Sequence, residues 1–370
     1  MTTLTDVLDR LTQPGDLYET LPDKAIRCTA CGHRCLIRPG KRGICQVRFN
    51  ADGELRVPWG YVGALQADPI EKKPFSHVLP GTTALTFGML GCDFHCGFCQ
   101  NWLTSQAARD PASDAALSLV RETSPKEMVA LARRARAEVI VSSYNEPLIT
   151  SEWAVAIFKE AKAAGLMCAY VSNGNSTPEV LAYIKPYISA YKVDLKSMQE
   201  KNYRAVGGVL KNTLTTIERA HEMGLWVEVV TLVIPGFNDS NEELWEAARF
   251  LRGVSADIPW HVTAFHKDYR MTDPENTPAT TLLRAAEIGR EAGLNFVYAG
   301  NLPGRVDEYE TTFCPGCQEA LVRRNGYVVS EYKITGEGKC PSCGAKVPGL
   351  WPKDPGAVKL YGIGIPLPVR

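Results

Sequence analysis

The chain has 370 residues, and its 41 basic side chains balance 41 acidic ones, so the formal net charge is zero. This balance excludes capture of nucleic acid or an anionic membrane by overall charge, and the 45% hydrophobic content is that of an ordinary folded protein. At roughly 150 residues per domain, the length allows two or three domains, or one large α/β domain with additions. The unusual feature is 12 cysteines, which are too few for a small disulfide scaffold and too many for a typical cytosolic enzyme.

The N-terminus lacks the basic start and apolar stretch of a secretory signal, and no apolar run reaches the roughly 18 residues of a membrane span. We therefore expect a cytoplasmic protein whose cysteines meet reducing conditions and serve as metal ligands or catalytic groups. Residues 1–27 are expected to be a short helical lead-in. The first cysteine set follows as Cys28, Cys31, Cys35 and Cys45, and its four thiolates suit either zinc or an iron–sulfur cluster.

From residue 83, after an irregular Gly- and Pro-rich connection over 51–82, apolar runs alternate with helical patterns. The apolar runs cover 84–90, 138–142, 167–171, 190–193, 226–234, 260–265 and 296–299. The helical patterns cover 126–137, 152–164, 178–184, 213–223, 242–252 and 280–292. Ser124, Pro125 and Glu127 have the pattern of a capped helix start. This alternation predicts an α/β protein with a parallel sheet and right-handed crossovers, either doubly wound or a full or partial barrel.

Three cysteines follow the first apolar run at the spacing C-x3-C-x2-C: Cys92, Cys96 and Cys99. Thiolates suit zinc or an iron–sulfur cluster, but a structural zinc site takes four protein ligands. Three cysteines on a four-iron cluster would leave one iron open to chelate the amine and carboxylate of S-adenosylmethionine (SAM), as in radical cofactor systems. The alternative is zinc with His95 or a distant residue as the fourth ligand.

Polar, Gly or Pro residues also follow the next five apolar runs. In chain order they are Asn145 and Glu146, Ser172 and Asn173, Asp194 and Lys196, Pro235 and Gly236, and His266. In a β/α barrel the active site forms where the carboxyl ends of the strands meet. In a full or partial barrel, these residues and the three cysteines would therefore meet at one mouth.

The last cysteine set comprises two C-x2-C pairs, Cys314 with Cys317 and Cys340 with Cys343. This is the zinc-ribbon pattern and predicts structural zinc, with an auxiliary iron–sulfur cluster or unligated thiols as alternatives. The remaining cysteine, Cys168, lies in an apolar run and is expected to be a core residue. The predicted organisation is an N-terminal Cys-rich segment, a barrel, a C-terminal four-cysteine module and an irregular tail, over 1–82, 83–302, 303–350 and 351–370.

Several longer motifs resemble those of one known family. They are the Cys28–Cys35 opening, 71–74 (Glu-Lys-Lys-Pro), 91–102, 144–147 (Tyr-Asn-Glu-Pro), 172–174, 194–196, 234–239, 265–266 and 298–301. Over roughly residues 25–345, the sequence resembles the radical SAM superfamily. It is most similar to the pyruvate formate-lyase activating-enzyme branch and, within it, to the radical SAM enzymes of the AmmeMemoRadiSam system.

The resemblance implies a partial (β/α)6, TIM-like barrel, a [4Fe–4S] cluster on Cys92, Cys96 and Cys99, and a set of residues that bind SAM. By resemblance, Phe98 and the Pro235–Gly236 turn lie by the adenine, Asn145 and Glu146 by the amino group, Ser172, Asn173 and Lys196 by the ribose and carboxylate, and His266 by the ribose. Each has a plainer alternative: a core aromatic, a turn, a strand-end cap, a solvated lysine or a structural histidine. Asp194 matches a carboxylate of a monovalent-cation site, but Val171 replaces the second aspartate, which puts a bound cation in doubt.

The implied activity is that of an oxidoreductase. A one-electron reductant would drive SAM cleavage to a 5′-deoxyadenosyl radical, which abstracts hydrogen from a backbone glycine of a partner protein or from a small molecule. The alternative is a non-enzymatic multi-zinc module that binds nucleic acid or protein. Its basic pieces, 133–136 and 323–324, are short and are expected to be solvated faces, so no nucleic acid or membrane partner is expected.

Overall fold

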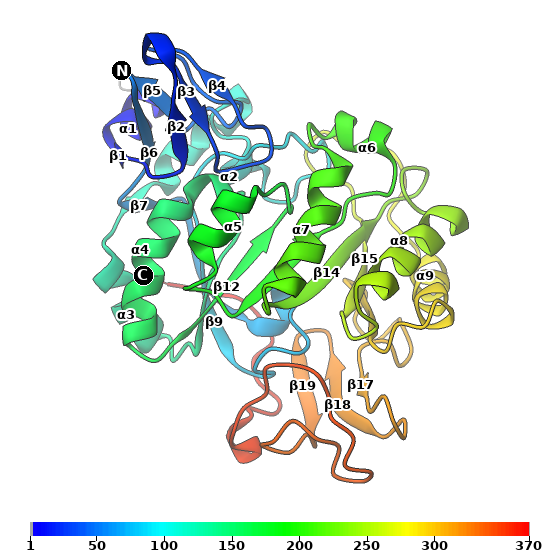
Figure 1. Cartoon of the computed structure of the whole chain (residues 1–370). Helices are drawn as coiled ribbons and strands as arrows, with labels where there is room; N and C mark the ends of the chain where they lie inside the picture. Colours follow the sequence, from blue (N-terminus) through cyan, green and yellow to red (C-terminus); the bar gives the residue numbers. More distant parts are fainter. Residues whose placement is uncertain (1–2, 370) are drawn as a thin grey trace.

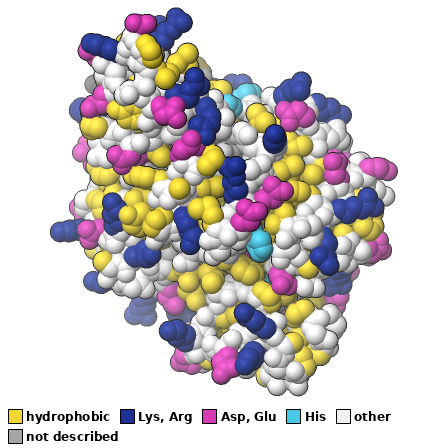
Figure 2. Space-filling model, in the orientation of Figure 1, with side chains coloured by type: hydrophobic (Ala, Val, Ile, Leu, Met, Phe, Trp, Pro, Cys, Tyr) yellow, Lys and Arg dark blue, Asp and Glu magenta, His cyan; other side chains and the backbone are white. Residues whose placement is uncertain are grey.

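The computed structural model describes residues 3–369 and is arranged around one large sheet (Figure 1). Short N-terminal strands lie at one end of the molecule, and the small sheet next to the last cysteine set lies at the opposite end. The side chains of Lys and Arg are intermixed with those of Asp and Glu over the face seen in Figure 2. This mixture agrees with the zero net charge of the chain.

The central sheet has nine strands, of which seven are parallel. In spatial order they are β16 (Val297–Gly300), β15 (Trp260–Ala264), β14 (Trp226–Val233), β13 (Ala190–Asp194), β12 (Met167–Ser172), β11 (Val139–Ser142), β9 (Thr83–Gly88), β8 (Ala64–Pro69) and β20 (Leu367–Pro368). The parallel strands coincide with the seven apolar runs, which confirms the α/β class. The sheet is open, since β16 and the antiparallel β20 are its two edges within residues 3–369.

Helices connect the parallel strands and, in Figure 1, α4, α5 and α7 lie in front of the sheet. The helices of this region are α2 (Trp102–Ser105), α3 (Pro125–Arg134), α4 (Ser151–Ala163), α5 (Pro178–Ile184), α6 (Glu200–Ala205), α7 (Leu210–Glu222), α8 (Asn241–Val254) and α9 (Ala279–Glu291), with 3-10 turns η3 (Pro111–Leu119) and η4 (Pro147–Thr150). Ser124 caps α3 as predicted, because its side chain accepts the amide of Glu127 while the carboxylate of Glu127 accepts the amide of Ser124.

The N-terminal region differs from the expected helical lead-in. Only α1 (Leu4–Arg10) is an α-helix in residues 3–27. The region forms small antiparallel sheets from β1 (Thr12–Pro14), β6 (Glu54–Pro58) and β5 (Phe49–Ala51), from β2 (Tyr18–Thr20), β3 (Ile26–Cys28) and β4 (Leu36–Ile37), and from β7 (Tyr61–Val62) with β10 (Arg121–Glu122). Turns η1 (Pro22–Lys24) and η2 (Ile70–Lys72) complete it. The expectation of irregular chain over 51–82 is therefore wrong, because strands this short show too little periodicity and depend on distant partners.

The C-terminal region contains a three-stranded antiparallel sheet of β17 (Thr312–Phe313), β18 (Ala320–Asn325) and β19 (Val328–Tyr332), followed by the turn η5 (Pro355–Ala357). The tail expected to be irregular returns to the main sheet, where β20 pairs with β8. Cys168 is 1% exposed on β12, which confirms it as a core residue. Within the part of the chain that the structure describes, no helix combines the length and apolar character needed to cross a bilayer.

Candidate functional site

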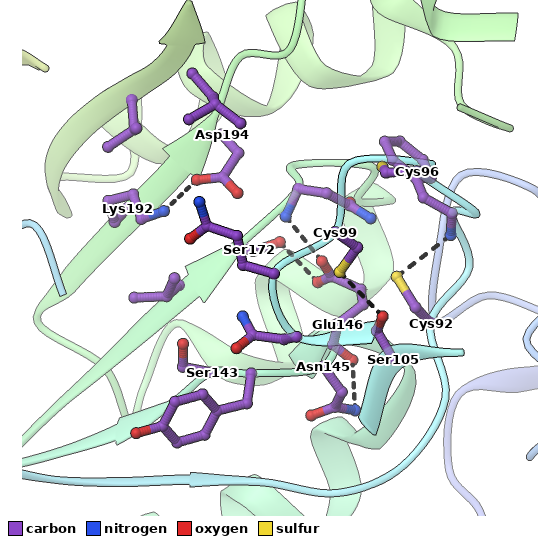
Figure 3. Close-up of a pocket in the computed structure, with 18 of the residues that line it drawn as sticks. Cys92, Cys96, Cys99, Ser105, Ser143, Asn145, Glu146, Ser172, Lys192 and Asp194 are labelled. Atoms are coloured by element: carbon purple, nitrogen blue, oxygen red, sulfur yellow. Dashed lines mark hydrogen bonds and ion pairs between the residues drawn. The ribbon is translucent and has the colours of Figure 1, made fainter. Parts of the chain in front are cut away.

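A cavity of about 290 Å³ opens at the carboxyl ends of the parallel strands. Most of the residues singled out in the sequence line it: Cys92, Cys96, Phe98, Cys99, Asn145, Glu146, Ser172, Asn173, Asp194 and Lys196. Figure 3 shows the three cysteines on one side of the pocket and Lys192 with Asp194 on the other. The meeting of strand ends predicted from the sequence thus gathers these side chains around one cavity.

The cysteine loop is fixed by backbone and amide contacts. The carboxylate of Asp93 is buried and accepts the side-chain amides of Asn173 at 2.7 Å and Asn175 at 2.8 Å. Ser105 Oγ lies 3.1 Å from the sulfur of Cys99, and the amide of Phe94 donates to the sulfur of Cys92 at 3.4 Å. Asn173 therefore holds the loop as well as lining the cavity.

Burial raises the pKa of all three thiols, and that of Cys96 rises to about 12. For Cys92, the carboxylates of Asp93 and Glu146 add to this effect. A thiol in such surroundings stays protonated unless a cation compensates the thiolate, as a bound metal does. The three side chains thus have the donor chemistry of a thiolate metal site, and no other cysteine is among the residues that line the described cavity.

Glu146, which follows β11, makes two sets of contacts. It caps η4 by accepting the amide of Leu148 at 3.0 Å, and it accepts Ser172 Oγ and the amide of Asn173, both at 2.7 Å. Burial, reinforced by Asp93, raises the pKa of Glu146 to about 8. Glu146 is therefore both a strand-end cap and a residue of the cavity. Its buried carboxylate forms no ion pair with another described residue, and an incoming ammonium group would supply a compensating positive charge.

The turn that carries Asn145 and Glu146 needs a glycine opposite it. A Cβ at Gly88 would collide with the carbonyl oxygen of Ser143 and lie 2.9 Å from Cβ of Tyr144. Asn145 Oδ1 accepts the amide of Met89 at 3.0 Å, which joins this turn to the strand end that leads into the cysteine loop. The close approach of the two strand ends places Glu146 near the thiols.

Asp194 is engaged by two lysines. One carboxylate oxygen pairs with Lys192, and the other lies 2.7 Å from Nζ of Lys196. Burial alone would raise the pKa of Asp194, but the two ammonium groups outweigh it and hold the pKa well below its usual range. Val171 also lines the cavity, so the position of the missing second aspartate is apolar. The ammonium groups of Lys192 and Lys196 thus pair with the carboxylate of Asp194, which the resemblance assigns to a monovalent-cation site.

Three predicted residues lie outside the lining of the cavity. They are Pro235, Gly236 and His266. His266 is exposed, with Nδ1 3.3 Å from the carbonyl of its neighbour Lys267. The amide of Gly236 donates to Asp239. In the same turn, the ring of Phe237 meets that of Phe98 edge to face at 5.7 Å between centroids, and the side-chain amide of Asn238 donates to the carbonyl of Lys196 at 2.8 Å.

Other lining residues were given no role by the sequence analysis. They include Lys72, Lys73, Ser143, Tyr144, Lys192, Thr263, Asn301 and Tyr327. Lys72 and Lys73 belong to the Glu-Lys-Lys-Pro motif at 71–74, which was noticed without a function. Tyr327 comes from the C-terminal sheet region, and no local pattern connects it with the main sheet.

The two flanking cysteine sets differ in how closely their sulfurs approach. Cys314, Cys317, Cys340 and Cys343 have ligand atoms all within 4.8 Å of one another, the only group of metal-binding residues so gathered in residues 3–369. This geometry indicates a metal site of four thiolates. The N-terminal cysteines are not gathered in this way. Cys28, Cys31 and Cys45 are buried and Cys35 is half-buried, so metal binding by this set stays a prediction.

The chain is similar to known proteins over most of its length. The model of the radical SAM superfamily matches residues 87–251. An uncharacterized protein of Methanocaldococcus jannaschii is 34% identical over 333 residues, which cover 89% of this chain and 97% of that protein. An isethionate sulfite-lyase activating enzyme of Oleidesulfovibrio alaskensis is 28% identical over 130 residues, or 33% of this chain and 41% of that enzyme.

Two solved structures illustrate more distant similarity. A domain of pyruvate-formate lyase-activating enzyme from Bacteroides vulgatus is 18% identical with a TM-score of 0.38, covering 44% of this chain and 98% of that one. SuiB of Streptococcus suis is 15% identical with a TM-score of 0.46, covering 63% and 52%. The family match and the relative aligned over nearly its whole length show that this chain belongs to the radical SAM superfamily, which implies a [4Fe–4S] cluster and S-adenosylmethionine as cofactors.

Proposed function

We propose that this protein cleaves SAM reductively to methionine and a 5′-deoxyadenosyl radical, which abstracts a hydrogen atom from a substrate in the cavity. One observation carries the proposal: the three thiols of the C-x3-C-x2-C motif line the same cavity as Glu146 and Lys196. The family needs metal-binding thiols and a site for a charged amino acid group side by side. A carboxylate and an ammonium group next to the thiols supply the second requirement.

Cys92, Cys96 and Cys99 fit a [4Fe–4S] cluster as its three protein ligands. When bound, the cluster supplies the single electron that breaks the carbon–sulfur bond of SAM. The chain prepares this position by burying the thiols, whose raised pKa values mean that they ionise only with a compensating cation. Ser105 is placed to donate a hydrogen bond to the thiolate of Cys99.

Glu146 and Lys196 would bind the two charged groups of the methionine part of SAM. Glu146 accepts the ammonium group, and Lys196 pairs with the carboxylate while keeping its contact with Asp194. Phe98 packs by the adenine, and Ser172 and Asn173 lie within reach of the ribose. Pro235, Gly236 and His266 would have to approach from outside the present lining to take the roles that the resemblance implies.

Apolar side chains would protect the radical from water. Phe94, Phe98, Val171, Val230 and Leu232 line the cavity. Exclusion of water prevents side reactions of a reactive intermediate. The role of these residues would be to position the substrate and to exclude solvent.

The flanking cysteine sets would bind zinc or auxiliary iron–sulfur clusters. For the C-terminal set we favour structural zinc, since two of its sulfurs are buried and two exposed at the turns of a small sheet. For the N-terminal set we also favour zinc. A reducing compartment such as the cytoplasm would keep all these thiols available, and a one-electron reductant would be needed there.

A second candidate function is activation of a partner protein by abstraction of hydrogen from its backbone. The observation that favours it is the similarity to an isethionate sulfite-lyase activating enzyme over 130 residues. In this case the substrate would be a loop of the partner inserted at the mouth of the cavity. The chemistry at the thiols would be the same.

The decisive experiment is an anaerobic SAM cleavage assay. The protein is reconstituted with iron and sulfide, reduced, mixed with SAM, and analysed for 5′-deoxyadenosine by mass spectrometry. We expect product from the wild type and none from Cys96→Ala. A colourless protein that contains zinc without iron and forms no 5′-deoxyadenosine would overturn the proposal and favour the multi-zinc module.

A further inference from the structure

The end of the cavity away from the thiols is rich in lysine. Lys72 and Lys73 reach it from η2 and the residue after it, Lys192 from β13, and all three line the cavity. The proposed SAM-binding residues include none of them. Lys73 and Lys192 are buried, with side chains only 5% exposed, and Lys72 is 26% exposed. Ammonium groups are rarely buried without a partner, so the charges around them decide what this end of the cavity can bind.

Two carboxylates form ion pairs with these lysines. Asp68 is fully buried and lies 2.7 Å from Nζ of Lys73 and 3.0 Å from Nζ of Lys72. Asp194 pairs with Lys192 and also with Lys196. Counting Lys196, which also interacts with the thiols of Cys96 and Cys99, four ammonium groups share these two carboxylates, which leaves an excess of positive charge.

The environment of Lys73 reflects that excess. Burial lowers the pKa of Lys73 to about 8, Asp68 opposes the shift, and the neighbouring ammonium groups of Lys72 and Lys192 add to it. The ammonium group also lies over the ring of Tyr144, 4.5 Å from its centroid. A further negative charge beside Lys73 would relieve the repulsion among the lysines.

Tyr144 contacts both Asp68 and Lys73. Its hydroxyl donates to Asp68 at 2.6 Å, and its backbone adopts φ +67°, a left-handed conformation that non-glycine residues rarely take. Such strained residues are concentrated at ligand sites, where the surrounding structure maintains them. The tyrosine thus keeps Asp68 and Lys73 aligned beside the cavity.

The C-terminal region braces the segment that carries these lysines. Arg324 donates to the carbonyl of Ser76 at 2.7 Å and lies 3.9 Å from Glu71, while Glu71 accepts the amide of Gly81 at 2.8 Å. Glu228 of β14 accepts the amides of Ser76 and His77, both at 2.9 Å. The turn with Lys72 and Lys73 is therefore held between the main sheet and the C-terminal sheet, and Tyr327 of the C-terminal region forms part of the cavity lining.

We propose that Lys72, Lys73 and Lys192 bind an anionic group, a carboxylate or a phosphate, of the substrate on which the radical acts. This inference rests on the proposed function and names the substrate class for the same cavity. Buried ammonium groups give strong charge-assisted hydrogen bonds to such anions. The anionic group would anchor the substrate at the lysine end and leave its carbon–hydrogen bond toward the thiols.

The test measures anion binding by calorimetry on anaerobically reconstituted protein at low ionic strength. Inorganic phosphate is the probe for a phosphate group, and succinate is the probe for a carboxylate. Lys73→Gln and Lys192→Gln should each weaken the better probe by about tenfold or more. Lys126→Gln, an exposed lysine on α3, is the matched control and should bind as the wild type does.

Asp68→Asn tests whether removing a competing carboxylate strengthens probe binding. It removes a carboxylate that competes for Lys72 and Lys73 but that also keeps Lys73 charged, so the measurement is made at pH 6, where it should tighten probe binding by about tenfold. This prediction holds even where a lysine variant fails to fold. Weaker or unchanged binding in Asp68→Asn would show that the lysines only neutralise structural carboxylates.

The outcomes separate this inference from the proposed function. Wild-type protein that forms 5′-deoxyadenosine but binds neither probe would overturn the inference alone. Probe binding that is unaffected by Lys73→Gln and Lys192→Gln would also overturn it. Protein that binds a probe through these lysines but cleaves no SAM would refute the proposed function and leave an anion site. The probe that binds more tightly identifies the anionic group.

Discussion

Arg48→Met should destabilise the junction between the N-terminal sheets and the main sheet, and the loss should depend on pH. Arg48 and Glu152 form a buried pair with two hydrogen bonds, at 2.7 and 2.8 Å, and their side chains are 1% and 2% exposed. Arg48 also donates to the carbonyl of Ile149 at 3.0 Å. Without Arg48, Glu152 would keep only backbone amides at 3.3 and 3.4 Å.

The size of the loss follows from the charge left on Glu152. Burial by itself would raise the pKa of Glu152, but Arg48 outweighs it and holds the pKa below the ordinary value of 4.5. In the variant the carboxyl is expected to take a proton instead, which at pH 7 costs about 3.4 kcal/mol, or about 1.4 kcal/mol for each pH unit above 4.5. We therefore expect Arg48→Met to lower the free energy of unfolding by about 3–5 kcal/mol at pH 7.

The sign of the pH dependence is fixed by the same groups. A carboxylate with a lowered pKa stabilises the fold above its ordinary pKa and loses this contribution as the pH falls through the lowered value. In Arg48→Met the cost of protonating Glu152 falls by about 1.4 kcal/mol for each pH unit, so the difference between wild type and variant should shrink to roughly 1–2 kcal/mol at pH 5. Arg48→Met combined with Glu152→Gln removes both charges and should recover most of the stability at pH 7.

Urea unfolding followed by tryptophan fluorescence measures these differences. Trp153 follows Glu152 directly, and its ring packs edge to face on Trp59 at 5.0 Å between centroids, so the signal reports this junction. A loss below about 1 kcal/mol at pH 7, or a loss that is independent of pH, would show that Glu152 is not an uncompensated buried charge in the variant.

Three further predictions concern the site itself. Glu146→Gln should weaken SAM binding about tenfold or more, because the carboxylate that accepts the amino group is lost; an unchanged dissociation constant in equilibrium binding would contradict this. Gly88→Ala should cost roughly 1–3 kcal/mol in urea unfolding, since the new Cβ meets the Ser143 carbonyl, and an unchanged midpoint would mean that this turn moves freely. Cys317→Ser should remove one metal site per chain from the C-terminal set by elemental analysis while the iron bound at Cys96 is retained; unchanged total metal content would argue against a site there.

The sequence by itself determined the chemistry and the order of the main elements. The C-x3-C-x2-C spacing, the two C-x2-C pairs and the alternation of apolar runs with helices are local features, and each is encoded within one short stretch. The seven predicted strands appear in the sheet because fully buried parallel strands are continuous apolar runs, which local hydrophobicity identifies. Most of the polar residues that follow these strands converge, because the carboxyl ends of parallel strands lie at one edge of the sheet.

The tertiary structure alone decided which residues meet across long separations. Lys73 and Lys192 share one cavity although more than 100 residues lie between them, and Tyr327 joins them from another sheet region. The short N-terminal strands and β20 exist only through pairing with distant partners, such as Leu367 with Ala67. His266 and Gly236 follow strands as the others do, but their loops turn away from the cavity. Periodicity and spacing describe neighbours along the chain, whereas charge sharing and strand pairing depend on packing between segments, which no single stretch encodes.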